Sequence, residues 1–378
     1  MARIAIPAET AANETRVAAT PETVKKYIAL GCEVVVQQGA GDKAFFADAA
    51  YQEAGATLGD HFESVVKDAD VILKVQPLNK DELQMVNKRA VVASLHMPFT
   101  NPLLQDYAKH GLTSFCMEMI PRTSRAQSMD VLSSQANIAG YKAVLLALEH
   151  YQKFMPMLMT AAGTVQPAKV LVMGAGVAGL QAIATARRLG AMVEAFDVRL
   201  AAKEQVESLG AKFVEVPQDE DAEDEGGYAK EMSEEYKQKQ AELIAKHAAQ
   251  ADIVITTALI PGKPAPVLIT EETVANMKQG SVIVDMAVEA GGNCPLSEKD
   301  AVWVKDGVTI VGVSNIPATL ATDASALYAK NMLNFMGLVL NKETGELHID
   351  REDDIIQGSL LCTEGEFLKP SLLERGGI

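Results

Sequence analysis

The sequence predicts an α/β protein with two Rossmann-like, doubly wound parallel-sheet domains, separated by a cleft and joined by long crossing helices. From Val170 onward, apolar and β-branched strands alternate with helical segments, and a looser alternation fills residues 1–132. Two long helical stretches, 133–153 and 324–340, lie where the chain would cross between the domains. We therefore expect a discontinuous N-terminal domain of residues 1–132 and 325–378, and a second domain of residues 133–324.

Each expected strand is a short apolar run that is rich in β-branched residues. In the first domain these runs are Ile4–Ile6, Glu33–Gln37, Val71–Val75, Val91–Leu95 and Ser114–Met117. In the second domain they are Val170–Met173, Met192–Phe196, Lys212–Val216, Asp252–Thr257, Val282–Asp285 and Thr309–Val313. A helical pattern covers Pro21–Ala29, and we expect residues 341–378 to pack back on the first domain.

A glycine pattern follows the first strand of the second domain. Gly174, Gly176 and Gly179 form Gly-x-Gly-x-x-Gly between this strand and a helical segment. The first glycine permits a tight turn, the second lets the backbone approach a pyrophosphate, and the third lets helix and strand pack closely. The pyrophosphate would bind the free N–H groups at the helix N-terminus, beside Val177 and Ala178. A purely structural turn is the alternative.

Asp197 ends the next strand, eighteen positions after Gly179, where a ribose-binding carboxylate belongs. It would accept hydrogen bonds from the ribose hydroxyls of NAD, but it would repel a 2′-phosphate by roughly 4 kcal/mol per unit charge at ~4 Å. That repulsion exceeds one hydrogen bond of about 1 kcal/mol. The pattern therefore favours NAD, with Val198 and Arg199 in the same site. Arg199 could instead pair with a phosphate, which leaves NADP open.

Further cofactor contacts are expected at the carboxyl ends of the other strands, where ligands of such sheets bind. The loops at that edge are 256–262, 285–292 and 314–317. In the first loop we expect Thr257, Ala258 and Leu259 to contact the cofactor.

Composition excludes several classes of protein. The net charge of −16 argues against nucleic acid as a partner, because phosphate neutralisation needs a basic face. The four cysteines lack metal-ligand spacing, so we expect reduced thiols and no metal site. The first residues read as a strand and not as a signal peptide, and no window reaches ~18 uninterrupted apolar residues. We expect a cytosolic protein or one peripheral to a membrane.

Residues 215–235 interrupt the alternation with ten acidic residues and one lysine. Such clustered charge is typical of a solvated loop. A plain exposed insertion is one interpretation. Tyr228 beside paired glycines favours a mobile lid at about 218–235.

A second polar segment, residues 121–130, lies just before the crossing helix. Its side chains could be those of an ordinary surface loop. Arg122, Gln127, Asp130 and Ser133 could also converge on a cofactor amide.

With these motifs, the chain resembles the NAD(H)-binding domain I, in the alpha subunit, of proton-translocating nicotinamide nucleotide transhydrogenases. The resemblance covers essentially all 378 residues. It is carried by segments 122–130, 159–164, 174–179 with Asp197, 226–231 and 256–266.

The resemblance implies that this chain binds NAD(H) and passes hydride directly to NADP⁺ on a partner domain, coupled to proton translocation through a membrane-spanning domain. It implies that Arg122, Gln127, Asp130 and Ser133 fix the nicotinamide, and that Gly227, Tyr228 and Ala229 belong to a loop that closes over NAD(H). We expect a homodimer without a membrane span, held on the inner face of the cytoplasmic membrane by its partner subunits. The chain end suggests either a naturally split subunit or a shortened chain.

Alanine dehydrogenases share this fold and supply the main alternative, an amino-acid oxidoreductase. Arg16 matches their carboxylate-binding arginine, and His96 matches their catalytic histidine. Their Lys-Val-Lys pattern, however, is Lys74-Val-Gln76 here, and their active-site aspartate is replaced by Glu289. A neutral amide cannot carry the lysine's charge or exchange its proton. Arg16 and His96 are therefore expected to be structural, as a surface-pocket ion pair and a hydrogen-bonded core histidine. A non-catalytic NAD sensor is a third possibility.

Overall fold

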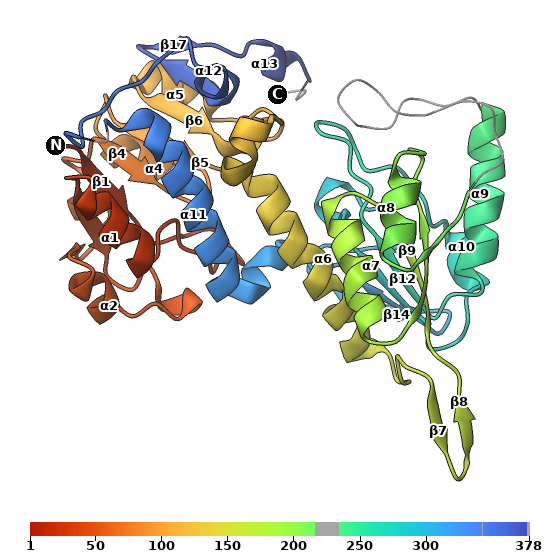
Figure 1. Ribbon diagram of the computed structural model, residues 1–378. Coiled ribbons are helices and arrows are strands. Elements are labelled where there is room, and N and C mark those ends of the chain that lie inside the picture. Colours follow the sequence, from red (N-terminus) through yellow and green to blue (C-terminus); the bar gives the residue numbers. More distant parts are fainter. Residues whose placement is uncertain (216–233, 342, 376–378) are drawn as a thin grey trace. The chain divides into compact units, whose positions relative to one another are not determined.

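The computed structural model describes residues 1–215, 234–341 and 343–375 (Figure 1). Contacts divide the chain into unit 1, residues 1–135 with 317–378, and unit 2, residues 136–316. The chain enters unit 2 within helix α6 (Val131–His150) and returns to unit 1 just before helix α11 (Ala321–Val339). The sequence placed these crossings after residues 132 and 324. Each unit is an α/β fold built on one large sheet.

Unit 1 contains an eight-stranded sheet with the order β17-β16-β6-β5-β4-β1-β2-β3. Strands β1 to β6 are parallel, whereas β16 pairs with β6 and β17 with β16 in antiparallel fashion. The C-terminal segment therefore packs on the first domain, as expected, by extending its sheet. The strands are β1 (Arg3–Ile6), β2 (Glu33–Gln37), β3 (Thr57–Gly59), β4 (Val71–Leu73), β5 (Val91–Ser94), β6 (Thr113–Cys116), β16 (Leu360–Thr363) and β17 (Glu366–Phe367).

Unit 2 contains a seven-stranded sheet with the order β11-β10-β9-β12-β13-β15-β14. All pairs are parallel except β14 with β15. The strand order reverses between β10 and β12, on either side of β9, and this reversal is the point at which doubly wound sheets bind ligands. The strands are β9 (Lys169–Met173), β10 (Met192–Phe196), β11 (Lys212–Phe213), β12 (Ile253–Thr256), β13 (Val282–Asp285), β14 (Val302–Lys305) and β15 (Val308–Val311).

Helices cover the sheets of both units. In unit 1 these are α1 (Pro21–Ala29), α2 (Asp48–Glu53), α3 (Phe62–Val66), α4 (Lys80–Met85), α5 (Leu104–His110), α12 (Asp354–Ser359) and α13 (Ser371–Arg375), with α11 and the start of α6. In unit 2 they are α7 (Val177–Arg188), α8 (Ala202–Ser208), α9 (Glu234–Ala248) and α10 (Glu271–Ala275). Short 3₁₀ turns are η1 (Asp42–Ala44), η2 (Met117–Met119), η3 (Ser124–Met129), η4 (Val288–Ala290) and η5 (Ile316–Leu320).

The buried residues of β9 show why unit 2 is doubly wound. Side chains alternate across a strand, so Val170 and Val172 pack on one face with apolar residues of α6, α7 and α8. Leu171 and Met173 pack on the opposite face with residues of α9 and α10. Both faces of the sheet are thus covered, which explains the uninterrupted apolar run in the sequence.

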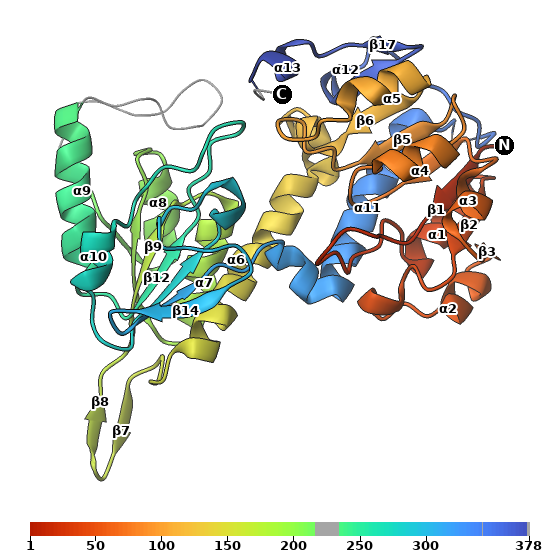
Figure 2. The same ribbon diagram turned by 180° about the vertical axis from the view of Figure 1, so that it is seen from behind.

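A two-stranded hairpin, β7 (Leu158–Thr160) and β8 (Gly163–Val165), projects from unit 2 and pairs with no other described strand (Figures 1 and 2). The sequence did not predict these strands, nor the edge strands β3, β14 and β17, nor β16 beside β17. All are short, and short runs lack a clear period. Among the described residues, no helix is long and apolar enough to cross a membrane. All four cysteines are buried and free, as expected.

Candidate dinucleotide site and nicotinamide loop

The turn after β9 requires its first glycine. Gly174 has a φ of +97°, a left-handed conformation that residues with a side chain rarely adopt. A Cβ atom there would also overlap the Thr257 hydroxyl. That hydroxyl donates to the carbonyl oxygens of Met173 and Gly174, at 3.2 and 3.1 Å. The ends of β9 and β12 are therefore joined across the turn.

The other two glycines have different roles. A Cβ atom on Gly179 would overlap the carbonyl oxygen of Gly174, so glycine lets α7 pack against the turn. A Cβ atom on Gly176 would meet nothing within 4 Å. Gly176 precedes the first residue of α7, and no side chain caps the helix there. Its N-terminal N–H groups, beside the exposed Val177, are free to receive an anion.

Helix α6 packs directly against the first turn of α7. A Cβ atom on Gly140 would overlap the carbonyl oxygen of Ala178. Gly140 was not among the predicted site residues, because nothing in the sequence indicates which residue of α6 meets α7. Its role is to hold the helix N-terminus at the carboxyl end of β9.

Asp197 lies at the end of β10, beside the same turn. Its Oδ2 accepts from the N–H of Ala175 at 2.7 Å, and its Oδ1 accepts from the N–H of Arg199 at 2.8 Å. The Arg199 guanidinium completes the arrangement, with Nε 3.0 Å from Oδ1 and Nη2 3.0 Å from Oδ2. The carboxylate is nearly buried, with 6% of the side chain exposed, whereas the arginine is 24% exposed. The structure thus places both predicted residues beside the glycine turn.

A buried asparagine supports the loop after β12. The Asn293 side chain accepts from the N–H of Ala258 at 3.1 Å and donates to the carbonyl oxygens of Ala258 at 2.9 Å and Pro266 at 2.8 Å. These bonds hold Thr257, Ala258 and Leu259 at the edge of the sheet, with Leu259 51% exposed. Asn293 lies one residue beyond the expected loop 285–292 and acts on a segment distant in sequence, so the sequence did not indicate its role.

Asp285, at the end of β13, is fully buried and supports the neighbouring loop. It accepts from the Thr256 hydroxyl at 3.1 Å and from the N–H groups of Ala287 and Cys294, at 2.9 and 3.0 Å. These bonds join the ends of β12 and β13. Glu289, by contrast, is exposed and pairs with Lys299 at 3.2 Å.

The expected nicotinamide loop belongs to unit 1 and includes η3. Arg122 and Gln127 are exposed, whereas Asp130 is half-buried. Asp130 accepts from Ser133, with its N–H at 2.9 Å from Oδ1 and its hydroxyl at 2.6 Å from Oδ2. This is an N-cap on α6, so the carboxylate and hydroxyl are held in one geometry. The structure therefore joins Asp130 with Ser133 and leaves Arg122 and Gln127 on the surface of the same loop.

Three anchors hold this loop on unit 1. Asn331 and Asn334 of α11 donate to the carbonyl oxygen of Ser128 at 2.8 and 3.0 Å. Arg125 forms a bidentate pair with Asp353 and also pairs with Asp354, at the start of α12. Ala126 and Met129 are buried in the core beneath. The polar loop thus has a fixed backbone although most of its side chains face solvent.

The expected lid over 218–235, with Gly227, Tyr228 and Ala229, lies outside the described residues, apart from its last two positions in α9.

Arg16 and Gln76 form a buried network in unit 1. Arg16 makes a bidentate pair with Glu14, at 2.8 Å from Nε and 2.7 Å from Nη2, and Gln76 donates to the same carboxylate at 2.6 Å. Burial raises the pKa of Glu14, but the hydrogen bonds and charge of Arg16 outweigh it and lower this pKa to about 2. The expected surface position of the ion pair is wrong, because the Arg16 side chain is only 3% exposed. The bidentate pair with Glu14 explains how the charged guanidinium of Arg16 is accommodated in the interior of unit 1.

His96 is a core residue, as expected. Its Nδ1 lies 2.9 Å from the carbonyl oxygen of Ser94, and its Nε2 lies 2.5 Å from the hydroxyl of Ser114. Burial lowers the pKa of this imidazole, against the opposing charge of Glu118. Lys74 is also buried and pairs with Glu9 and Glu82, at 3.3 and 3.4 Å.

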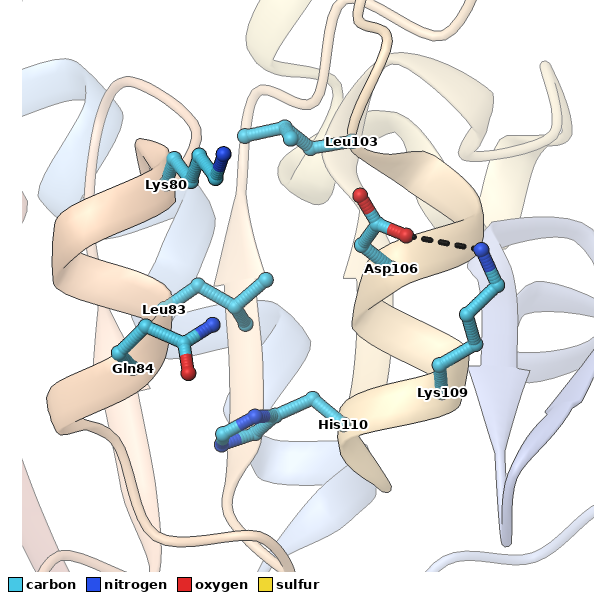
Figure 3. A pocket seen from close by; sticks show the side chains of 7 residues that line it. All are labelled: Lys80, Leu83, Gln84, Leu103, Asp106, Lys109 and His110. Atoms are coloured by element: carbon cyan, nitrogen blue, oxygen red, sulfur yellow. Dashed lines mark hydrogen bonds and ion pairs between the residues drawn. The ribbon is translucent and has the colours of Figure 1, made fainter.

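A separate pocket of unit 1 lies between α4 and α5 (Figure 3). It is lined by Lys80, Leu83, Gln84, Leu103, Asp106, Lys109 and His110. Lys109 pairs with Asp106 at 3.0 Å, and His110 lies 2.9 Å from the carbonyl oxygen of Val86. No residue predicted to bind the cofactor lines this pocket. Among the described residues, no group of three or more His, Cys, Asp or Glu could hold a metal ion.

The fold and the turn after β9 define a two-domain α/β protein of the NAD-binding dehydrogenase type. Family models agree: residues 5–139 match the N-terminal domain of alanine dehydrogenase/PNT, and residues 143–370 match its C-terminal domain. The chain therefore belongs to the alanine dehydrogenase/PNT family.

Among these relatives, the chain is more similar in sequence to the transhydrogenases than to the alanine dehydrogenases. The chain is 52% identical to a protein of Rhodospirillum rubrum that is named as the first part of NAD(P) transhydrogenase subunit alpha, over 99% of this chain and 100% of that protein. It is 28% identical to alanine dehydrogenase of Halomonas elongata, over 100% and 97%. A solved transhydrogenase structure from Sinorhizobium meliloti is 49% identical, covers 97% of this chain and 100% of its own, and superposes with a TM-score of 0.87.

Proposed function

We propose that this chain is the NAD(H)-binding component of a proton-translocating transhydrogenase. It passes hydride directly between NADH and NADP⁺ bound on a partner domain, and it acts only with that NADP(H)-binding domain and a membrane-spanning domain. The observation that carries the proposal is the turn from Gly174 to Gly179, which opens the N-terminus of α7 at the carboxyl end of β9. Asp197 at the adjacent strand end favours NAD(H).

This transfer requires that the two nicotinamide rings be positioned correctly, and it does not require a group that exchanges protons. Hydride transfer to a keto or imino acid needs a general acid–base. Transfer between two nicotinamides needs their C4 atoms held ~3–3.5 Å apart with water excluded. In the proposal, Arg122, Gln127, Asp130 and Ser133 fix the nicotinamide, with the Asp130–Ser133 cap keeping the amide-binding groups in place. The bound NAD(H) supplies the hydride.

The remaining cofactor contacts of the proposal lie in unit 2. Backbone N–H groups at the start of α7 bind the pyrophosphate, and the loop after β12 contacts the cofactor. The residues are Gly174, Gly176, Val177, Ala178, Gly179, Asp197, Val198, Arg199, Thr257, Ala258 and Leu259, with Gly227, Tyr228 and Ala229 in the loop that closes over it. Assembly as a homodimer on the inner face of the cytoplasmic membrane, through the partner subunits, is included in the same proposal.

Two residues argue against the alternative, an alanine dehydrogenase-like reaction. Gln76 stands at the lysine position of the dehydrogenases, and its amide is engaged with Glu14. Glu289, at the aspartate position, pairs with Lys299 on the surface. Neither side chain provides the buried acid–base group that amino-acid oxidation requires.

One experiment separates these functions. NADH and an NADP⁺ analogue are supplied to the chain with and without the NADP-binding domain, and hydride transfer is followed by absorbance. Transfer that depends on the partner supports the proposal. Oxidation of alanine with NAD⁺ by the chain alone would overturn it, and NAD(H) binding with neither activity would identify a sensor.

A further inference from the structure

Asp197 already accepts four hydrogen bonds from the protein. The N–H groups of Ala175 and Arg199 supply two, and the Arg199 guanidinium supplies the other two. A carboxylate has about four lone-pair directions, so the protein fills this acceptor. The hydroxyls of a bound ribose need acceptor positions on the same carboxylate.

Only one pair of these donors can leave. The two N–H groups belong to the backbone of the turn and of the strand end, so they can move only together with the backbone. The guanidinium is on a long side chain that is 24% exposed, whereas its partner carboxylate is 6% exposed. The half-buried guanidinium keeps part of its contact with solvent, which screens its pair with the carboxylate, so a ligand that binds elsewhere on the turn can displace it.

We propose that the Arg199 guanidinium competes with the ribose hydroxyls of the cofactor for Asp197, and that this competition makes Arg199 a specificity-determining residue. While the pair is intact, Asp197 is neutralised. The carboxylate then repels a 2′-phosphate less than a bare one would, and it is less available to a ribose diol. Arg199 therefore weakens NADH binding and moderates the rejection of NADPH. The inference rests on the proposed binding of NAD(H) at this turn.

The test measures dissociation constants of the whole chain for NADH and NADPH, by calorimetry or by NADH fluorescence. Arg199→Ala should bind NADH about two- to five-fold more tightly, the range that corresponds to breaking such a pair, and should bind NADPH more weakly. Arg188→Ala, at the exposed C-terminal end of α7, removes the same charge from the same unit and should change neither constant.

A double-mutant cycle identifies the cause. In an Asp197→Asn background the carboxylate for which the guanidinium and the ribose compete is absent, so adding Arg199→Ala should no longer tighten NADH binding. Unchanged or weaker NADH binding by Arg199→Ala overturns the inference, and so does an equal gain in the Asp197→Asn background. If the unmodified chain does not bind NADH at all, the proposed function itself fails, which is a distinct result.

Discussion

At the scale of single residues, substitutions of Gly179 and Gly176 at the start of α7 should distinguish an effect on stability from an effect on NADH binding. Gly179→Ala places a methyl group against the Gly174 carbonyl oxygen, so we expect a loss of about 1–3 kcal/mol in the free energy of unfolding and weak NADH binding. Gly176→Ala has open space and a φ of −74°, so its stability should equal that of the unmodified chain. It should nevertheless bind NADH at least ten-fold more weakly, because the methyl group occupies the approach of the pyrophosphate. Chemical denaturation and NADH titration measure both quantities.

The outcome for Gly176→Ala decides the role of the turn. Unchanged NADH binding in a stably folded Gly176→Ala chain would mean that the pyrophosphate does not lie against this residue.

A second residue-scale prediction concerns the buried ion pair of unit 1. Glu14→Gln leaves the Arg16 guanidinium buried without its carboxylate, which we expect to cost about 3–5 kcal/mol. Because the folded pKa of Glu14 is about 2 against an ordinary 4.5, the stabilisation is fully present above pH 4.5 and is lost as the pH falls toward 2. Urea denaturation of both proteins between pH 7 and pH 3 should show their stabilities converging as the pH falls.

The control for this prediction is Glu22→Gln, which breaks the exposed pair with Lys26 and should have little effect. A difference between Glu14→Gln and the unmodified chain that did not shrink at low pH would contradict the assigned ion pair.

At the scale of elements, the loop of η3 depends on α11 for its position. Asn331→Ala removes a donor to the Ser128 carbonyl oxygen and an acceptor for the Ser134 hydroxyl, which lies 2.7 Å away. We expect hydride transfer to the partner's NADP⁺ to slow several-fold, with NADH affinity largely kept. Arg122→Ala, which removes a proposed nicotinamide contact itself, should slow transfer by about 10- to 100-fold. Single-turnover transfer and NADH titration separate the two effects.

Matched controls exist on the same unit. Asn87→Ala and Arg89→Ala alter exposed residues between α4 and β5 and should leave transfer unchanged. If Arg122→Ala transferred hydride at the normal rate, the positioning role of the loop would be wrong.

At the scale of the whole molecule, the sequence predicted features with a clear residue pattern, but it did not predict individual contacts between segments that are distant in sequence. A helical pattern in the sequence predicted the helix Pro21–Ala29 with its limits. In the structure Thr20 and Thr23 cap this helix, and Pro21 suits its first turn. The sequence predicted the glycine turn, because three backbone requirements coincide there. It did not predict Asn293 or Gly140, since each acts on a segment distant in sequence. It placed Arg16 at the surface, because charged side chains are rarely buried unless they are paired. The sequence does not reveal that Glu14 and Gln76 form such a buried network with Arg16.

The last prediction concerns both units together, since the proposal assigns the ribose and pyrophosphate to unit 2 and the nicotinamide to the loop of unit 1. Hydrogen exchange followed by mass spectrometry compares NADH with ADP-ribose, which lacks the nicotinamide. Both ligands should slow exchange at the start of α7 and in the loop after β12, because both carry the ribose and pyrophosphate. Only NADH should slow exchange across residues 122–133. The β5 and β6 strands serve as an internal reference, because their amides pair within a buried sheet and should not respond to either ligand. Equal protection of residues 122–133 by both ligands would mean that this loop does not contact the nicotinamide. If NADH gave these residues no protection, the loop would not belong to the cofactor site.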